Sequence, residues 1–294
     1  MKAPAFEYSR VTTISDAIAL LAEHGDEAKI LAGGQSLVPA LNLRLLAPKL
    51  LIDIGGVDEL RSITVSNGKL VIGALARHVD VLRSDLVAAH APLLGKAVTH
   101  VAHPAIRNRG TFGGSLAHAD PASELPACVL ALGATIVTRG PNGERRIPVD
   151  EYFLGIYETA LEPTELLVAV EIPAKAPGSV FFFNEHARRN GDYALAGLAA
   201  QATVEGGRFT ALRLGYFAVG ERPVLASAAA EALIGVEVTQ AVIDAAQAAL
   251  DENLDPHDDL QAPADMRRYL ARGLLVRCVS TLLERSDLEV GGLS

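Results

Sequence analysis

The pattern of apolar positions predicts two helices and two strands in the first 55 residues. Apolar residues that recur every three to four positions are typical of a helix, and a short continuous apolar run is typical of a buried strand. The predicted order is a helix over residues 15–23, a strand over 28–32, a helix over 37–46 and a strand over 50–54. Gly33 and Gly34 interrupt the pattern between the first strand and the second helix.

The middle of the chain is expected to contain a β-hairpin, a helical region and a long irregular segment. Asn67-Gly68 is a strong hairpin signal between the apolar runs 63–65 and 69–72. Residues 80–101 are predicted to be mostly helical, and residues 103–126 irregular, because glycine and proline recur in the second stretch. A loop of this length inside a domain is usually functional when it is ordered. The pattern then predicts a helix over 125–132, a strand over 134–138, a turn at 141–143 and a strand over 165–173.

A short linker at residues 174–179 separates two parts of the chain that differ in their pattern of predicted elements. Beyond it the pattern predicts strands over 181–183, 197–204 and 209–220, and alanine-rich helices over 224–233, 239–250 and 264–283. We therefore expect a first domain over residues 1–176, with subdomains of about 1–55 and 56–176, and a second domain over 177–288.

Charge and cysteine content exclude several classes of protein. The 294-residue chain has 35 acidic and 26 basic residues, a net charge of −9, which argues against nucleic-acid binding. Cys128 and Cys278 lie far apart in apolar segments, so we expect buried free thiols rather than a disulfide framework or a four-cysteine cluster site. No apolar run is long enough to span a membrane and no signal peptide is evident, so the expected location is the cytoplasm.

Two glycine segments are the strongest candidates for a ligand site. Residues 33–36 (GGQS) follow a predicted strand and precede a helix, and residues 111–115 (TFGGS) repeat a Gly-Gly pair before a small hydroxyl residue. Glycines allow a ligand to approach the backbone and its N–H donors closely, and two such segments can hold a pyrophosphate from opposite sides. Neither matches the Rossmann or the P-loop spacing. Ordinary tight turns remain the alternative.

Polar residues near the second glycine segment extend the candidate site. Asp120 and Glu124 can accept hydrogen bonds from ribose hydroxyls, although Asp120 can also shape a turn and Glu124 can also sit at a helix N-terminus. Arg107 and Arg109 can contact a phosphate or take part in solvated salt bridges. The histidines form no recognised metal-ligand spacing, and we find no catalytic residue set. This combination favours redox chemistry carried by a bound cofactor.

Three stretches of the chain together resemble one known family. They are residues 30–37 (ILAGGQSL), 107–117 (RNRGTFGGSLA) and 119–126 (ADPASELP). They are similar to the FAD-binding medium subunit of the xanthine dehydrogenase and carbon monoxide dehydrogenase family, the molybdenum hydroxylases. The resemblance covers nearly the whole chain. It implies an α+β fold, with a two-part FAD-binding domain of the vanillyl-alcohol-oxidase (PCMH-like) type and a smaller α/β C-terminal domain of the CO dehydrogenase flavoprotein type.

The resemblance also implies which residues contact FAD. One segment would surround the pyrophosphate: Ile30, Leu31, Ala32, Gly33, Gly34, Gln35, Ser36 and Leu37. The opposing donors would come from Thr111, Gly113, Gly114 and Ser115. Glu124 matches an acidic residue that contacts the adenosine part, and Leu167 an FAD-contacting leucine. Tyr193 matches an aromatic residue near the isoalloxazine ring, with a core tyrosine as the alternative.

The sequence departs from the family pattern at three positions. Phe112 stands where isoleucine is common, Ser115 where asparagine or aspartate is common, and Asn184 where some relatives have a lysine near the flavin. Ser115 keeps a hydrogen-bond donor with a shorter reach. The change at Asn184 leaves open the charge near the flavin ring, and with it the flavin potential.

The resemblance implies partners as well. Two two-iron two-sulfur clusters would lie on a small subunit and the molybdenum cofactor on a large subunit, in a dimer of heterotrimers. Electrons would pass from the clusters to FAD and then to an external acceptor, which the sequence leaves open among NAD, oxygen, a quinone and a protein. The substrate is also open: carbon monoxide, an aldehyde or an N-heterocycle. Two alternatives are a stand-alone FAD-dependent oxidoreductase with its own substrate site, and an assembly module that has lost FAD.

Overall fold

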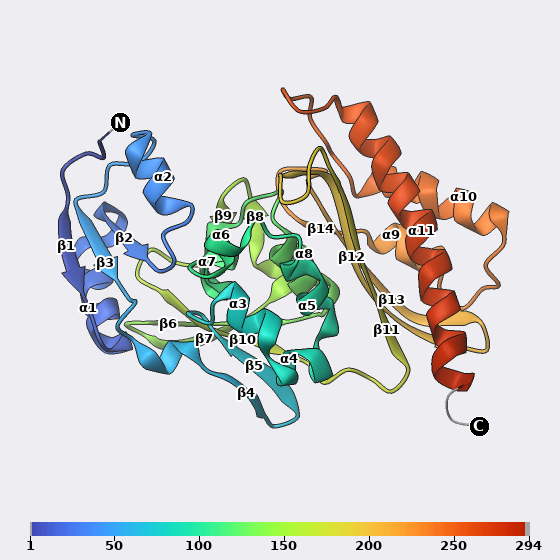
Figure 1. The fold of residues 1–294 in the computed structure, drawn as a ribbon, viewed down its shortest axis with the longest axis horizontal. Coiled ribbons are helices and arrows are strands. Elements are labelled where there is room, and N and C mark those ends of the chain that lie inside the picture. Colours follow the sequence, from blue (N-terminus) through green and yellow to red (C-terminus); the bar gives the residue numbers. More distant parts are fainter. Residues whose placement is uncertain (1, 292–294) are drawn as a thin grey trace.

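The computed structural model describes residues 2–291, with side chains described to residue 286. Within this range three main sheets follow one another along the longest axis of the molecule, from the N-terminal lobe to the long C-terminal helix (Figure 1). The first sheet has three strands, the second five and the third four. This mixture of sheets and helices, in the arrangement shown, is the expected α+β architecture.

The N-terminal lobe contains a small parallel sheet. Its order is β1 (Glu7–Arg10), β3 (Leu50–Asp53) and β2 (Ala28–Leu31), and it is accompanied by α1 (Ile14–His24) and α2 (Leu37–Asn42). Thr13 caps α1 by accepting a hydrogen bond from the backbone N–H of Asp16 at 3.1 Å. The predicted helix over 37–46 is too long, because the chain leaves the helix at Leu43 and Arg44 has a φ of 60°. The strand β1 was not predicted, because its mostly exposed residues form no apolar run.

The central sheet is antiparallel, in the order β4 (Ile63–Ser66), β5 (Lys69–Gly73), β10 (Leu166–Ile172), β6 (Thr135–Gly140) and β7 (Gly143–Pro148). Asn67 and Gly68 have φ of 50° and 76°, as the predicted hairpin between β4 and β5 requires. A small ribbon of β8 (Phe153–Gly155) and β9 (Glu158–Thr159) lies beside this region. The sheet packs on one side against the N-terminal core through Val137, Leu166 and Val168.

The other face of the central sheet is covered by short helices. The predicted helical region over 80–101 is three helices, α3 (His78–Arg83), α4 (Asp85–His90) and α5 (Pro92–Val98). The breaks have local causes, because Ser84 adopts an extended ψ of 120° and caps α4, and Pro92 starts α5. Leu93, Leu94 and Val98 of α5 are fully buried in this core.

The segment predicted to be irregular, 103–126, is instead largely helical. It contains α6 (Pro104–Arg107), α7 (Phe112–His118) and the first turn of α8 (Glu124–Ala131). Gly113 and Gly114 therefore lie inside a helix, although glycine disfavours helices. Close packing explains the glycine at position 113, because a Cβ added there would lie 2.6 Å from the Cβ of Ala74. The prediction failed because close tertiary contact overrides local propensity.

The C-terminal part is an antiparallel sheet of β11 (Ser179–Ala187), β12 (Ala194–Glu205), β13 (Arg208–Phe217) and β14 (Val224–Leu225). One face is covered by α9 (Ser227–Glu231), α10 (Gln240–Ala249) and α11 (Ala264–Gly291). The predicted helix over 224–233 is wrong in its first residues, which form β14 against β13. Successive residues of β12 alternate between two cores, as the period of a strand dictates: Leu198 faces the helices and Ala199 faces the central region.

The C-terminal sheet packs directly against the rest of the molecule. Phe181 and Phe217 belong to the same core as α5 and α8, and Gly215 allows the closest approach, because an added Cβ there would overlap the carbonyl oxygen of Ala127. Cys128 and Cys278 are buried free thiols, as predicted. Among the helices of residues 2–291, none combines the length and the apolar character needed to cross a bilayer.

Candidate functional site

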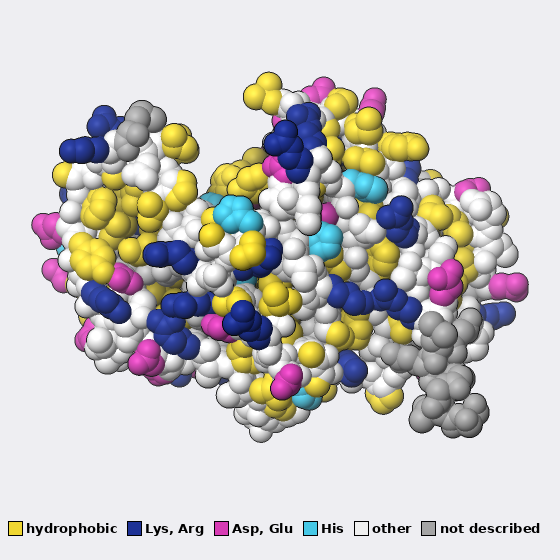
Figure 2. Space-filling model, viewed as in Figure 1, with side chains coloured by type: hydrophobic (Ala, Val, Ile, Leu, Met, Phe, Trp, Pro, Cys, Tyr) yellow, Lys and Arg dark blue, Asp and Glu magenta, His cyan; other side chains and the backbone are white. Residues whose placement is uncertain are grey.

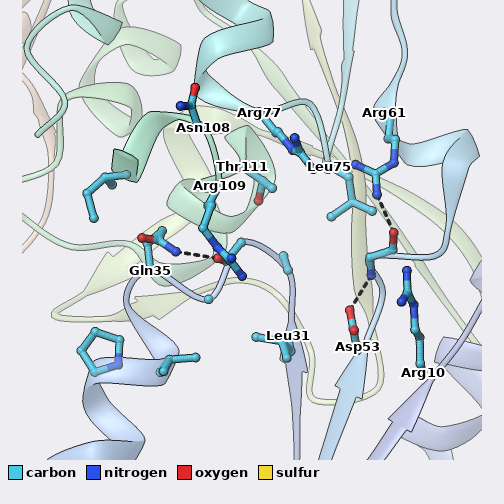
Figure 3. A pocket seen from close by; sticks show the side chains of 17 residues that line it. Arg10, Leu31, Gln35, Asp53, Arg61, Leu75, Arg77, Asn108, Arg109 and Thr111 are labelled. Atoms are coloured by element: carbon cyan, nitrogen blue, oxygen red, sulfur yellow. Dashed lines mark hydrogen bonds between the residues drawn. The ribbon is translucent and has the colours of Figure 1, made fainter. Parts of the chain in front are cut away.

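A cavity of about 790 Å³ lies between the N-terminal lobe and the central part of the molecule. Figure 2 shows this boundary as a hollow in the surface, with Lys and Arg side chains near its base. The volume is within the usual range for pockets that hold cofactors and other small molecules. Its walls include residues 31–35 on one side and Asn108, Arg109 and Thr111 on the other (Figure 3). The structure therefore brings both glycine segments of the sequence to one place.

The two segments touch each other directly. A Cβ added at Gly33 would overlap the carbonyl oxygen of Arg109 and lie 2.8 Å from the Cα of Gly110. A Cβ added at Gly114 would lie 3.8 Å from the Cβ of Ala32. Gly34 has a φ of 70°, a left-handed conformation that side chains disfavour. Close approach therefore requires Gly33, and backbone conformation favours glycine at position 34.

The first glycine segment has unused hydrogen-bond donors. The backbone N–H groups of residues 33–36 donate to no acceptor within the described part of the chain, whereas the N–H of Val38 already donates to the carbonyl of Gly34 at 3.1 Å. Gln35 turns its amide back and donates from Nε2 to the carbonyl of Gly33 at 2.9 Å (Figure 3). Successive free N–H groups in a turn form a concave site for an anion.

The second segment is different, because its backbone donors are already used. The N–H groups of Phe112 and Gly113 donate to the carbonyls of Ala76 and Ala74, and that of Gly114 donates to Thr111 Oγ1 at 3.1 Å. Ser115 N–H donates to the carbonyl of Thr111. The hydroxyl of Thr111 accepts in this bond and keeps its hydrogen as a possible donor to a ligand, whereas the hydroxyl of Ser115 is hydrogen-bonded to that of Ser123. The glycines of this segment thus serve packing between α7 and its neighbours.

Arginines give the cavity a positive character. Arg10, Arg77 and Arg109 line it, and within residues 2–291 none of the three forms an ion pair (Figure 3). Arg61 lines it too, but pairs with Asp58 at 3.3 Å and donates to the carbonyl of Gly55. Guanidinium groups without carboxylate partners attract phosphate and other anions. The sequence suggested this role for Arg107 and Arg109. Arg107 does not line the cavity and donates instead to the carbonyls of Val101 and Ala102. Arg10 and Arg77 were not suggested, because they are far from the glycine segments along the chain.

His78 supports the wall of the cavity from behind. It is buried, its Nε2 lies 3.1 Å from the carbonyl oxygen of Thr111, and its ring limits the space at Gly110. Burial lowers the pKa of His78 to about 4, with the charge of Arg107 acting in the same direction. The ring is therefore neutral at physiological pH. No motif marked His78 in the sequence, because its role depends on a contact with Thr111, 33 positions away.

The remaining candidate residues lie outside this cavity. Ser115 Oγ is 3.1 Å from Ser123 Oγ, and Asp120 Oδ1 accepts from the N–H of Ala122 at 2.9 Å. Leu167 is buried in the central core. Tyr193 is 60% exposed, which does not suit the alternative role of a core tyrosine. Ile30, Ser36 and Leu37 belong to the first segment but do not line the cavity wall.

Tyr193 belongs to an aromatic and acidic group that the sequence did not reveal. Partial burial, followed by the charges of Asp120 and Tyr157, raises the pKa of Tyr193 to about 12. The ring of Tyr157 stacks on His118 at a centroid distance of 4.8 Å. Tyr157 has a φ of 56° in the turn between β8 and β9, an unusual conformation for an aromatic residue. These side chains approach one another only through the fold.

Free backbone N–H groups, close glycine packing and arginines without ion pairs meet between two lobes, an arrangement that suits a cofactor containing a diphosphate. Comparisons with known proteins agree. Residues 4–175 match the FAD binding domain in molybdopterin dehydrogenase, and residues 181–282 match the CO dehydrogenase flavoprotein C-terminal domain.

Relatives match over nearly the full length. The chain is 40% identical to the 6-hydroxypseudooxynicotine dehydrogenase complex subunit alpha of Paenarthrobacter nicotinovorans, over 97% of each chain. It is 36% identical to the carbon monoxide dehydrogenase medium chain of Hydrogenophaga pseudoflava, over 96% of this chain and 98% of that one. A solved structure of carbon monoxide dehydrogenase from Hydrogenophaga pseudoflava superposes with a TM-score of 0.94 at 38% identity, over 97% of this chain and 99% of that one.

The chain belongs to the family of FAD-binding medium subunits of molybdenum hydroxylases. It is an oxidoreductase flavoprotein subunit. The resemblance stated from residues 30–37, 107–117 and 119–126 is confirmed, as is the expected fold, an FAD-binding domain followed by a domain of the CO dehydrogenase flavoprotein type.

Proposed function

We propose that this chain carries electrons through FAD, from iron–sulfur clusters on a partner subunit to an external acceptor. The observation that supports it most is the cavity whose walls include residues 33–35, with their free N–H groups, together with Arg77, Arg109 and Thr111. When bound, FAD supplies the redox chemistry, because it accepts and releases electrons that protein side chains do not carry. The protein supplies binding, orientation and electrostatics.

The residues of the two glycine segments would hold the diphosphate. The four N–H groups of residues 33–36 are free to donate, and Arg77 and Arg109 offer positive charge beside them. Thr111 would add its hydroxyl, and so would Ser115, whose hydroxyl is hydrogen-bonded to that of Ser123 in this structure. Ile30, Leu37, Gly113 and Gly114 would shape this region through packing. A diphosphate fits this donor set, because backbone N–H groups and guanidinium groups are its usual partners.

The other candidate residues would contact the remaining parts of FAD. We propose Asp120 and Glu124 for the hydroxyls of the adenosine part and Tyr193 for the isoalloxazine ring. Tyr193 is exposed and can therefore cover a ligand. Leu167 is buried, so its side chain would support the site from within the core. We also place the boundary between the two domains near residue 176, in the exposed segment between β10 and β11.

The proposed partners follow from the family. A small subunit would carry two two-iron two-sulfur clusters, a large subunit would carry the molybdenum cofactor, and two such heterotrimers would form a dimer. Substrate choice would be made on the large subunit. The names of the two relatives specify 6-hydroxypseudooxynicotine for one and carbon monoxide for the other, so similar medium subunits accompany different substrates.

Reconstitution with FAD tests the proposal. Full-length protein mixed with FAD and freed of excess flavin should show an oxidised flavin absorbance band that dithionite bleaches. Riboflavin, which lacks the diphosphate, should bind much more weakly. A protein that stays colourless with FAD would contradict the proposal. Turnover of a small substrate by this chain alone would support the stand-alone oxidoreductase instead.

A further inference from the structure

The C-terminal sheet ends on a long strand whose outer edge is open. β11 has nine residues and, within the described part of the chain, pairs only with β12. The other edge strands of the described sheets have six residues or fewer. Native proteins usually keep edge strands short or covered, because an open row of N–H and C=O groups is a template for another strand. The length of β11 therefore makes its edge a candidate docking surface.

The hydrogen bonds of Phe181 show which residues of β11 point away from β12. Lys96 Nζ and Arg285 Nη1 both donate to the carbonyl oxygen of Phe181, at 3.4 and 2.7 Å, so this carbonyl lies on the outer edge. In an antiparallel strand every second residue turns its N–H and C=O to the same side, and the register is regular from Phe181 to Glu185. Phe183 and Glu185 therefore also point outward. Their backbone groups form no hydrogen bond to another described residue.

Solvent reaches the backbone of β11 at Glu185. The side chain of Glu185 is only 4% exposed, and its Oε1 lies 3.1 Å from His100 Nδ1. The residue as a whole is nevertheless only half-buried, so the part that solvent reaches is its backbone. Phe183 is half-buried as well, with its ring 5.0 Å from that of His100 between centroids. The outer edge is thus closed by two cations at Phe181 and open at Glu185.

Basic side chains flank this edge. β11 runs between α5 and α11 and contacts both, and Figure 2 shows Lys and Arg side chains over this region. Lys96 comes from α5, and Arg277 and Arg285 come from α11; within the residues whose side chains are described, none of the three forms an ion pair. Arg277 lies close enough to His186 of β11 for its charge, after burial, to lower the pKa of His186. These cations outnumber the exposed Glu284 beside them, so the edge suits a negatively charged segment.

A second copy of this chain is a poor occupant for the edge. Two copies paired along β11 would bring the same three cations of each copy together, and like charges across an interface are unfavourable. Cations on an edge strand are a known protection against such self-association. An extended segment with acidic side chains has the opposite charge, and its backbone can pair with the outward residues of β11.

We propose that the edge of β11 at Phe183 and Glu185 binds an extended, acidic segment of another subunit of the complex, which adds to the four-stranded sheet as a further strand. The backbone of the segment would pair with these two residues, and its acidic side chains would lie near Lys96 and Arg277. The two cations at Phe181 would mark one end of the added strand. This inference rests on the proposed assembly with partner subunits and does not depend on FAD.

Amide hydrogen exchange at single-residue resolution tests the proposal, in the isolated full-length chain and in its complex with the proposed small and large subunits. In the isolated chain the N–H groups of Phe183 and Glu185 should exchange much faster than that of Asn184, which faces β12. In the complex their exchange should slow at least about tenfold. Slow exchange at both residues in the isolated chain would overturn the proposal, because the edge would already be covered. Unchanged rates in the complex would overturn it too, while the assembly itself would stand.

Two substitutions at Glu185 separate its backbone from its side chain. Glu185→Pro and Glu185→Ala both remove the carboxyl group, but only proline removes the outward N–H, which an edge strand tolerates. Both variants should melt cooperatively and take up FAD as wild type does, because Glu185 does not line the cavity. Glu185→Pro should bind the partner subunit at least about tenfold more weakly than Glu185→Ala. Equal affinities of the two variants would overturn the proposal.

The acidic character of the segment is tested with Arg277→Glu. This variant should weaken assembly about tenfold at low salt and less at high salt, because salt screens exposed charges. Arg208→Glu is the matched control, since Arg208 is exposed at the start of β13. Wild-type affinity in Arg277→Glu would contradict an acidic segment. Flavin absorbance of the same samples separates the two proposals: slowed exchange at Phe183 and Glu185 in a complex without FAD supports the docking edge even where FAD fails to bind, and a chain that joins neither subunit contradicts both the assembly and the edge.

Discussion

Gly33 packs so closely against the backbone of Arg109 that an added Cβ would overlap the carbonyl oxygen of Arg109. This contact joins the turn after β2 to the turn before α7, and it places free N–H groups beside unpaired guanidinium groups. The proposed cofactor site depends on this contact more than on any other. Substitutions in this contact, in the charged residues of the cavity and in the residues that support its wall should each change FAD affinity or folding stability.

Gly33→Ala should strongly weaken FAD binding. The added methyl group must displace the backbone of Arg109 or of residues 33–36, and either shift disturbs the donors of the cavity. We expect the affinity for FAD to fall at least about tenfold. Gly95→Ala is the matched control, because Gly95 is a helical residue with open space around its Cβ position. Fluorescence titration of both variants with FAD compares their affinities. Wild-type affinity in Gly33→Ala would show that this contact does not shape the site.

The sequence predicted most of the local structure and both glycine segments, but not what surrounds them. The hairpin at Asn67-Gly68 was predictable because the turn residues set its geometry. The helix at Gly113 was not, because its cause is the contact with Ala74, 39 positions away. For the same reason Arg10 and Arg77 could not be assigned to the cavity. Long-range packing, rather than local propensity, decides these cases.

Removing charge from the cavity should weaken FAD binding in a salt-dependent way. Arg77→Gln and Arg109→Gln each remove an unpaired guanidinium group from the wall. We expect a loss of about 1 kcal/mol for each, or about fivefold in dissociation constant at low salt, and a smaller loss at high salt. The exposed Arg83 on α3 offers the control Arg83→Gln. Dissociation constants that do not change in either cavity variant would exclude a role for these arginines in FAD binding.

The stability of the protein should fall in acid because of His78. Its pKa is about 4 in the folded chain, against 6.5 for an unperturbed histidine, so the unfolded chain binds a proton that the folded chain rejects. The contribution of neutral His78 is complete above about pH 6.5 and is lost as the pH falls to about 4, by about 3 kcal/mol in all. Urea unfolding at several pH values measures this.

His78→Gln should flatten part of this pH dependence, because glutamine does not titrate. His257→Gln should not, since the side chain of His257 is 59% exposed. An identical pH profile for wild type and His78→Gln would show that another group causes the acid sensitivity.

Thr111→Val should lower stability by about 1 kcal/mol, because it removes the cap that accepts from the N–H of Gly114. Thr111→Ser should restore most of this loss, since serine is also a good cap. The same pair of variants tests the proposed hydroxyl donor to FAD, with valine weakening binding and serine retaining it. Equal thermal midpoints for the valine and serine variants would argue against the cap.

Trypsin should cleave the folded chain at Lys175 without separating the two parts. Residues 173–178 are exposed and lie outside helices and strands, whereas Phe181 and Phe217 are buried in the core shared with α5 and α8. The two fragments should therefore run together in size-exclusion chromatography after cleavage. Lys175→Gln should prevent this cut. Fragments that separate in native buffer would show that the shared core is too weak to hold them.

The backbone N–H groups of residues 33–36 are the proposed ligands of the FAD diphosphate, and the whole site is built around them. Amide NMR of the full chain during an FAD titration tests this most directly, with riboflavin as the ligand that lacks the diphosphate. We predict downfield shifts of the amide protons of Gly33, Gly34, Gln35 and Ser36 with FAD and not with riboflavin. Bound FAD that leaves these four resonances unchanged would contradict the proposed binding mode.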